Sequence, residues 1–240
     1  MSPDLIPKIA STLGSENLLR EIYSDLARPG VAQVGKAIGG ILGLGNTALW
    51  PVHLLNERAA AALKANLERY RKSLEKIPVE EIQPVPPEVG VPVAEKLAYV
   101  TNPELAAMYT KLLKCASCQS TSGYAHPAFA NIIGNMSPDE AILLKEISRS
   151  GYITYFVEEQ LGIRVVSFRE ELSDQLVFPR NVQAYLSNFD GMGLTTLTLG
   201  KVVKSALNLP ASQQPTRRPG EAQLTLFGKL FSNACVDTAK

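Results

Sequence analysis

Cysteine, histidine and tryptophan are scarce in this chain, which has three, two and one of them among 240 residues. So few cysteines exclude a mini-protein held together by disulfides, and an odd number leaves at least one thiol unpaired. The opening residues, MSPDLIPKIASTLG, lack the basic and apolar regions of a secretory signal. We therefore expect the protein to reside in a reducing cytoplasm.

Net charge is also nearly absent, because 24 Lys and Arg offset 23 Asp and Glu to leave +1. No global field then draws the chain to nucleic acid or anionic lipid. The P-loop, GxGxxG, HExxH and GxSxG signatures are missing as well. The sequence predicts no enzyme, no catalytic residue, no metal site and no cofactor.

What is present is a globular composition, with 45% hydrophobic residues and a length that can bury a large core. Helical periodicity dominates residues 1–77, where Leu63, Leu67, Tyr70, Leu74 and Ile77 form a seam of coiled-coil type. Five prolines between 78 and 92 predict an extended connector that no helix can cross, placed within 78–100. A helical region over 101–150 follows.

Two helices of that region have clear start signals. Thr101-Asn102-Pro103-Glu104 precedes a helix expected over 103–116, and Ser137-Pro138-Asp139-Glu140 forms a capping box before a helix over 138–149.

Residues 151–240 change character after Gly151. Short runs rich in β-branched and aromatic residues predict strands over 151–159, 162–168, 194–199 and 222–227, with helices over 181–189 and 228–236. A polar loop rich in Pro, Gln and Arg is expected over 209–221. We therefore expect an α+β fold, mainly α, in which an N-terminal helical region is followed by a smaller module like a winged helix with a long wing.

Residues 37–55 carry no formal charge, and Gly35, Gly39 and Gly43 recur at four-residue intervals. Such glycines on one helix face permit very close approach of another helix. We favour a buried or shielded helix in a soluble bundle, and for the protein as a whole we expect a protein partner or self-association. Conditional membrane insertion at the inner membrane, with Trp50 as an interfacial anchor, and constitutive spanning are the alternatives.

Three smaller motifs have both a functional and a structural interpretation. Cys115 and Cys118 have CxxC spacing but lie at a helix C-terminus, where the dipole disfavours a thiolate, so we favour buried thiols. The loop with His126, Pro127 and Phe129 is either a functional loop or, as we favour, a turn that begins a helix. A basic cluster in and before the 209–221 loop either contacts nucleic acid or, as we favour, is a solvated loop; it comprises Lys201, Lys204, Arg217 and Arg218.

The chain also resembles the Abi-alpha (abortive infection alpha) family from about residue 20 to its end. The resemblance rests on nine segments: 22–29 (IYSDLARP), 34–39 (VGKAIG), 42–51 (LGLGNTALWP), 66–70 (NLERY), 77–78 (IP), 86–92 (PPEVGVP), 125–129 (AHPAF), 137–141 (SPDEA) and 224–235 (LTLFGKLFSNAC). It implies a bacterial protein of phage defence by abortive infection and supplies no catalytic residues.

We therefore expect a non-enzymatic abortive-infection protein that acts through a protein partner or conditional membrane binding. A membrane-permeabilising effector is the leading mechanism of that class, because residues 37–55 offer an insertable hairpin. The alternative is a nucleic-acid-binding regulator that uses residues 181–236. A nuclease or hydrolase without a familiar signature comes third.

Overall fold

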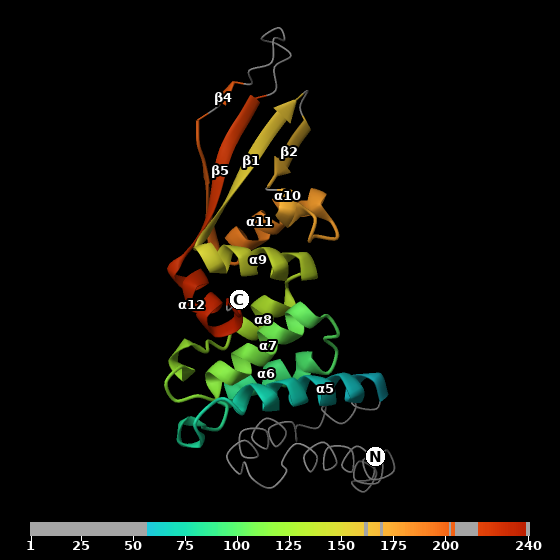
Figure 1. Ribbon diagram of the computed structural model, residues 1–240, viewed down its shortest axis with the longest axis vertical. Helices are drawn as coiled ribbons and strands as arrows, with labels where there is room; N and C mark the ends of the chain where they lie inside the picture. The colour runs from blue at the N-terminus through green and yellow to red at the C-terminus, as the bar shows by residue number, and fades with distance from the viewer. Residues whose placement is uncertain (1–56, 161–162, 169, 202, 205–215, 239–240) are drawn as a thin grey trace, which may run out of the picture. The chain divides into compact units, whose positions relative to one another are not determined.

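A computed structural model (Figure 1) describes residues 57–160, 163–168, 170–201, 203–204 and 216–238. The chain divides into two compact units, Met1–Asn135 and Met136–Lys240. Helices make up the described part of the first unit, whereas the second combines helices with one antiparallel sheet. The expected α+β class, mainly α, is confirmed.

The first unit is built on α5 (Glu57–Leu74), which packs against α6 (Pro87–Leu97) and α7 (Pro103–Ala116). Leu63, Leu67, Tyr70 and Leu74 are fully buried. These four members of the predicted seam are therefore confirmed as the face of α5 that meets the core, whereas the fifth, Ile77, lies beyond the end of the helix and is half-buried. The unit is completed by α8 (Phe129–Gly134) and by the short 3-10 helices η1 (Val79–Glu81) and η2 (Ser122–Tyr124).

The prediction that no helix crosses the proline-rich stretch is wrong, because α6 begins at Pro87 and continues through Pro92. Pro87 lies at the start of the helix, where a proline is tolerated because its missing N–H would have no intrahelical partner. Val89, Val93 and Leu97 are buried, so packing on α5 and α7 compensates for the hydrogen bond that Pro92 cannot donate. Tertiary burial here overrides a local signal.

The predicted caps are present. Asn102 Oδ1 accepts the N–H groups of Glu104 and Leu105 at the start of α7. In the second unit, α9 (Pro138–Ser150) begins with a reciprocal capping box, in which Ser137 N–H donates to Glu140 Oε2 over 2.6 Å and Glu140 N–H donates to Ser137 Oγ over 3.3 Å. The predicted helices over 103–116 and 138–149 are therefore confirmed.

The sheet of the second unit has the order β2-β1-β5-β3, with β4 also paired to β5, and every pairing is antiparallel. Its strands are β1 (Tyr152–Gln160), β2 (Ile163–Ser167), β3 (Thr195–Leu199), β4 (Val203–Lys204) and β5 (Thr216–Leu224). The remaining elements of this unit are α10 (Glu170–Ser173), η3 (Pro179–Asn181), α11 (Val182–Gly191) and α12 (Leu226–Cys235).

The prediction of a loop over 209–221 is wrong for residues 216–221, which form the first part of the strand β5. Pro219 is tolerated because its position opposite Phe156 is one where β5 exchanges no hydrogen bonds with β1. Toward β3 its carbonyl accepts the N–H of Gly200 over 2.7 Å, just after that strand ends. Gly220 leaves room for Tyr155, whose ring would lie 2.3 Å from a Cβ at that position.

The sequence assigns 138–149 to the helical region 101–150, but α9 packs against β1, β5 and α12. It therefore belongs to the second compact unit, which begins at Met136. Gly151 ends α9 with φ of 83°, and its N–H donates to Ile147 O over 2.7 Å. Its carbonyl then accepts the N–H of Leu224, so the helix passes directly into the sheet.

Candidate functional site

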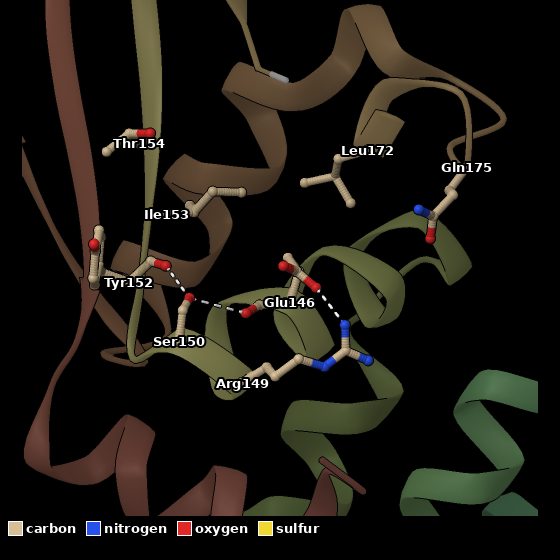
Figure 2. A pocket seen from close by; sticks show the side chains of 8 residues that line it. All are labelled: Glu146, Arg149, Ser150, Tyr152, Ile153, Thr154, Leu172 and Gln175. Atoms are coloured by element: carbon tan, nitrogen blue, oxygen red, sulfur yellow. Dashed lines mark hydrogen bonds and ion pairs between the residues drawn. The ribbon is translucent and has the colours of Figure 1, made fainter. Parts of the chain in front are cut away.

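A surface pocket of about 360 Å³ lies where α9 passes into β1 (Figure 2). The last part of α9 forms one wall of the pocket, and the first residues of β1 form the second. The third wall is formed by α10 and by residues 174–175, which follow it. The lining residues are Glu146, Arg149, Ser150, Tyr152, Ile153, Thr154, Leu172 and Gln175.

Polar groups on the helix side of this pocket are engaged with one another. Arg149 Nη1 donates to Glu146 Oε2 over 2.8 Å, and both side chains are about two-fifths exposed, at 42% and 41%. The Ser150 hydroxyl contacts the carbonyls of Tyr152 and Glu146. Leu172 is buried and Ile153 half-buried, so the pocket has an apolar floor beside a polar rim.

The wall that carries Leu172 and Gln175 is fixed by Asp139, near the other end of α9. Asp139 Oδ1 accepts the N–H of Val177 over 2.9 Å, and Oδ2 accepts the N–H of Phe178 over 2.7 Å and the hydroxyl of Tyr185 over 3.0 Å. Asp139 is only 2% exposed, so these bonds form away from water, where a charged acceptor is strongest. The segment after α10 is thereby tied to α9.

Glu140 makes a second connection to α11. Its Oε1 accepts the side-chain amide of Asn188 over 2.7 Å, while Oε2 serves the capping box. Desolvation by burial raises the pKa of Tyr185, and the hydrogen bond to Asp139 raises it further. The 137–140 motif therefore sets the geometry of the second unit as well as starting a helix.

The CxxC pair lies in the first unit, and both cysteines are buried free thiols. Cys115 Sγ donates to Thr121 O over 3.1 Å, and Cys118 Sγ donates to Glu81 Oε2 over 3.2 Å. Burial raises the pKa of the Cys115 thiol, whereas the hydrogen bond from Cys118 lowers the pKa of Glu81. The expected burial is confirmed. In the described ranges, no group of three or more His, Cys, Asp or Glu residues could hold a metal ion.

His126, Pro127 and Phe129 lie at the start of α8. His126 Nδ1 accepts the N–H of Ala128 over 3.1 Å, and its ring centroid lies 5.5 Å from that of the fully buried Phe129. Phe129 N–H donates to His126 O over 3.0 Å. The loop is thus a turn that leads into α8, and it lies in a different unit from the pocket.

The basic residues lie on strands and strand ends rather than in a loop. Arg217 is opposite Glu158 of β1, Arg218 is exposed opposite Val157, and Lys204 of β4 pairs with Thr216. Lys201 is exposed just after β3. The structure does not group these residues with the pocket. Gly35, Gly39, Gly43 and Trp50 lie outside the described residues.

The C-terminal motif joins α12 to the end of α11. Thr225 Oγ1 accepts the N–H of Gly228 over 2.8 Å and donates to Gly193 O over 2.6 Å. A Cβ on Gly228 would lie 1.9 Å from Leu194 O, so only glycine permits this approach. Thr225 and Gly228 of this motif are therefore both explained by the packing and capping of α12.

The sequence interpretation missed the pocket residues. One signal was available, because a capped helix that ends at a glycine before a β-branched strand indicates a sharp helix-to-strand corner. The third wall comes from residues 172–175, which no local pattern brings to that corner.

Fold and site together define a two-unit α+β protein with a surface pocket in the sheet-containing unit. The family profile described as "Abortive infection alpha" matches residues 62–235, so the chain belongs to the abortive infection alpha family. No curated protein and no solved structure matches it. In the part of the chain that the structure describes, no helix is both long and apolar enough to cross a membrane.

Proposed function

We propose that the protein acts in phage defence by abortive infection, as a non-enzymatic protein of the bacterial cytoplasm that binds a partner protein at the pocket of the second unit. Family membership supports the biological role. The pocket supports the binding role, because its ion pair and serine hydroxyl are engaged with neighbouring groups and an apolar floor lies beside them. The observation that carries the proposal is the buried Asp139, which fixes one pocket wall through three hydrogen bonds.

Conditional membrane contact is the proposed downstream step. Its support is the uncharged stretch 37–55 with Gly35, Gly39, Gly43 and Trp50. In this scheme the partner binds the second unit, and the N-terminal residues act at the inner membrane. Membrane potential in infected cells, with Gly39→Leu beside the unaltered protein, tests this step separately from partner binding.

Expression in a phage-sensitive bacterial host tests the proposal. We expect fewer plaques, survival of the culture at a low phage-to-cell ratio and its collapse at a high ratio, because infected cells die before they release progeny. Tyr152→Ala removes an exposed pocket side chain and should abolish protection. Tyr124→Ala is the matched control, since Tyr124 is exposed to a similar degree, 45% against 47%, but lies in the first unit.

Unaltered plaque numbers with the wild-type protein would contradict the proposed role. Equal protection by wild type and Tyr152→Ala would instead show that the pocket is not the contact.

The second candidate is a nucleic-acid-binding regulator, and sheet order favours it. A winged helix places its first strand beside its last, as β1 lies beside β5 here, and α9, α10, α11 and β3 follow the corresponding sequence order. Against it, the exposed side chains of α11, the helix that would enter the groove, are neutral or acidic: Gln183, Ala184, Ser187 and Asp190. Salt-dependent duplex binding that weakens when Arg217 and Arg218 become Ala would favour this candidate.

A further inference from the structure

The first residues of β1 form an open sheet edge beside the pocket. The ladder between β1 and β2 runs only from Phe156 opposite Ser167 to Gln160 opposite Ile163. On the opposite side of β1, the ladder with β5 covers Tyr152 to Glu159. In the described part of the chain, Tyr152 to Thr154 therefore have β5 as a strand neighbour on one side and lie beyond the last residue of β2 on the other.

Register determines which backbone groups point to that open side. Leu224 N–H donates to Gly151 O over 3.0 Å, so Gly151 and Leu224 form a hydrogen-bonded pair. In an antiparallel ladder such pairs alternate, which directs Ile153 and Tyr155 toward β5 and Thr154 toward the side of β2. The N–H and C=O of Thr154 thus point along the sheet, beyond the end of β2 and at the pocket that Thr154 lines.

We propose that this pocket is a peptide groove, in which an extended segment of the partner protein adds to the sheet as an antiparallel strand beside residues 152–155. This strand addition rests on the proposed function and specifies that the partner protein binds through an extended segment of its backbone. Backbone pairing with Thr154 supplies the recognition that strand addition uses at an open edge.

The side chains that line the pocket specify the rest of the ligand. Side chains alternate along β1, so a bound residue opposite Ile153 places its side chain on the face of Ile153, toward Leu172 (Figure 2). Ile153 and Leu172 favour an aliphatic or aromatic residue there. The neighbouring residues of the bound segment place their side chains on the opposite face, beside the exposed Tyr152 and Thr154, and are therefore polar.

The probe is an array of blocked seven-residue peptides with Val, Ile, Leu or Phe as the third residue and polar residues at the other positions, because an antiparallel segment has room for only two residues between that position and Ser167 of β2. We expect purified full-length protein to bind a subset of them. Adding an N-methyl group to the backbone amide that pairs with Thr154 should weaken binding at least tenfold on the unaltered protein, because it removes a ladder donor and adds bulk at the edge. Methylation at an adjacent amide, which points away from β1, is the peptide-side control.

Thr154→Pro is the protein-side test. It removes an outward N–H but no bond to β5, and it should weaken binding of the best array peptide at least tenfold. Leu199→Pro is its matched control: Leu199 N–H also points away from β5, at the opposite edge of the same sheet, and this change should leave binding unaltered.

No array binding by wild type, or equal binding of the methylated peptide, would overturn strand addition. If circular dichroism shows that Thr154→Pro does not fold, binding of the methylated peptide to the wild-type protein decides whether strand addition occurs. Peptide binding without any effect on phage would support the groove and contradict the proposed function. Phage protection that survives Thr154→Pro in a folded protein would support the proposed function and contradict the groove.

Discussion

The two units bury different kinds of side chain between their elements. In the first, α5 meets its neighbours through the apolar seam, with Asn66 adding amide bonds to the carbonyls of Leu97 and Val100. In the second, two buried carboxylates, Asp139 and Glu140, hold α9 to α11 and to the segment after α10. An apolar seam tolerates small shifts, whereas a buried carboxylate requires each donor in place. The pocket lies in the unit with the more demanding geometry.

Gly228→Val should have the largest effect. The new Cβ would meet the Leu194 carbonyl at 1.9 Å, and because that atom is backbone, α12 must move away. We expect a loss of about 3 kcal/mol or more, since overpacking against backbone leaves no side chain to rotate aside. Urea unfolding measures it. Gly191→Ala is the control: nothing lies within 4 Å of its Cβ, so an equal loss there would contradict the close-approach explanation.

Leu67→Ala tests the apolar side of the comparison. Leu67 is fully buried in the α5 seam, and its truncation should cost about 3 kcal/mol through lost burial and a residual cavity. Phage protection should persist at temperatures where the variant stays folded, because the pocket lies in the other unit. Thermal unfolding and plaque counts together check this. Loss of protection in a folded variant would show that the first unit contributes to the site.

Asp139→Asn should cost less in stability but more in function. The amide keeps the shape of the carboxylate yet loses its charge and presents an N–H₂ to a donor, so we expect a loss of about 2 kcal/mol. Protection should fall to the level of Tyr152→Ala. Urea unfolding and plaque counts measure the two effects. Protection equal to wild type would mean that the Asp139 bonds are not needed for the site.

Cys115 should show the smallest effect, visible only as reactivity. Its raised pKa means that the folded protein carries less thiolate than the unfolded chain at the same pH. By linkage, the associated stability is present below the unfolded pKa and is lost as pH rises through the folded pKa. Iodoacetamide should label Cys115 more slowly at pH 8 in the native protein than in urea. Equal rates would indicate an accessible, reactive thiol.

Sequence predicted those parts whose signals are local. Asn102 and Ser137 fixed the starts of α7 and α9, and the spacing of Leu63, Leu67 and Tyr70 identified the buried face of α5. Proline misled twice: α6 forms because Val89 and Val93 are buried, and β5 contains Pro219 because the register places it where β1 requires no donor. The pocket was not predictable, because unequal strand lengths and the Asp139 bonds are both long-range features.

Hydrogen–deuterium exchange of wild type and Asp139→Asn tests most directly the claim that a buried carboxylate holds the pocket wall. The account predicts at least tenfold faster exchange at the amides of Val177 and Phe178 in the variant, with faster exchange also across 172–176. Amides of α7 in the first unit should exchange at the wild-type rate. Unchanged exchange at Val177 and Phe178, or an equal increase in both units, would contradict the claim.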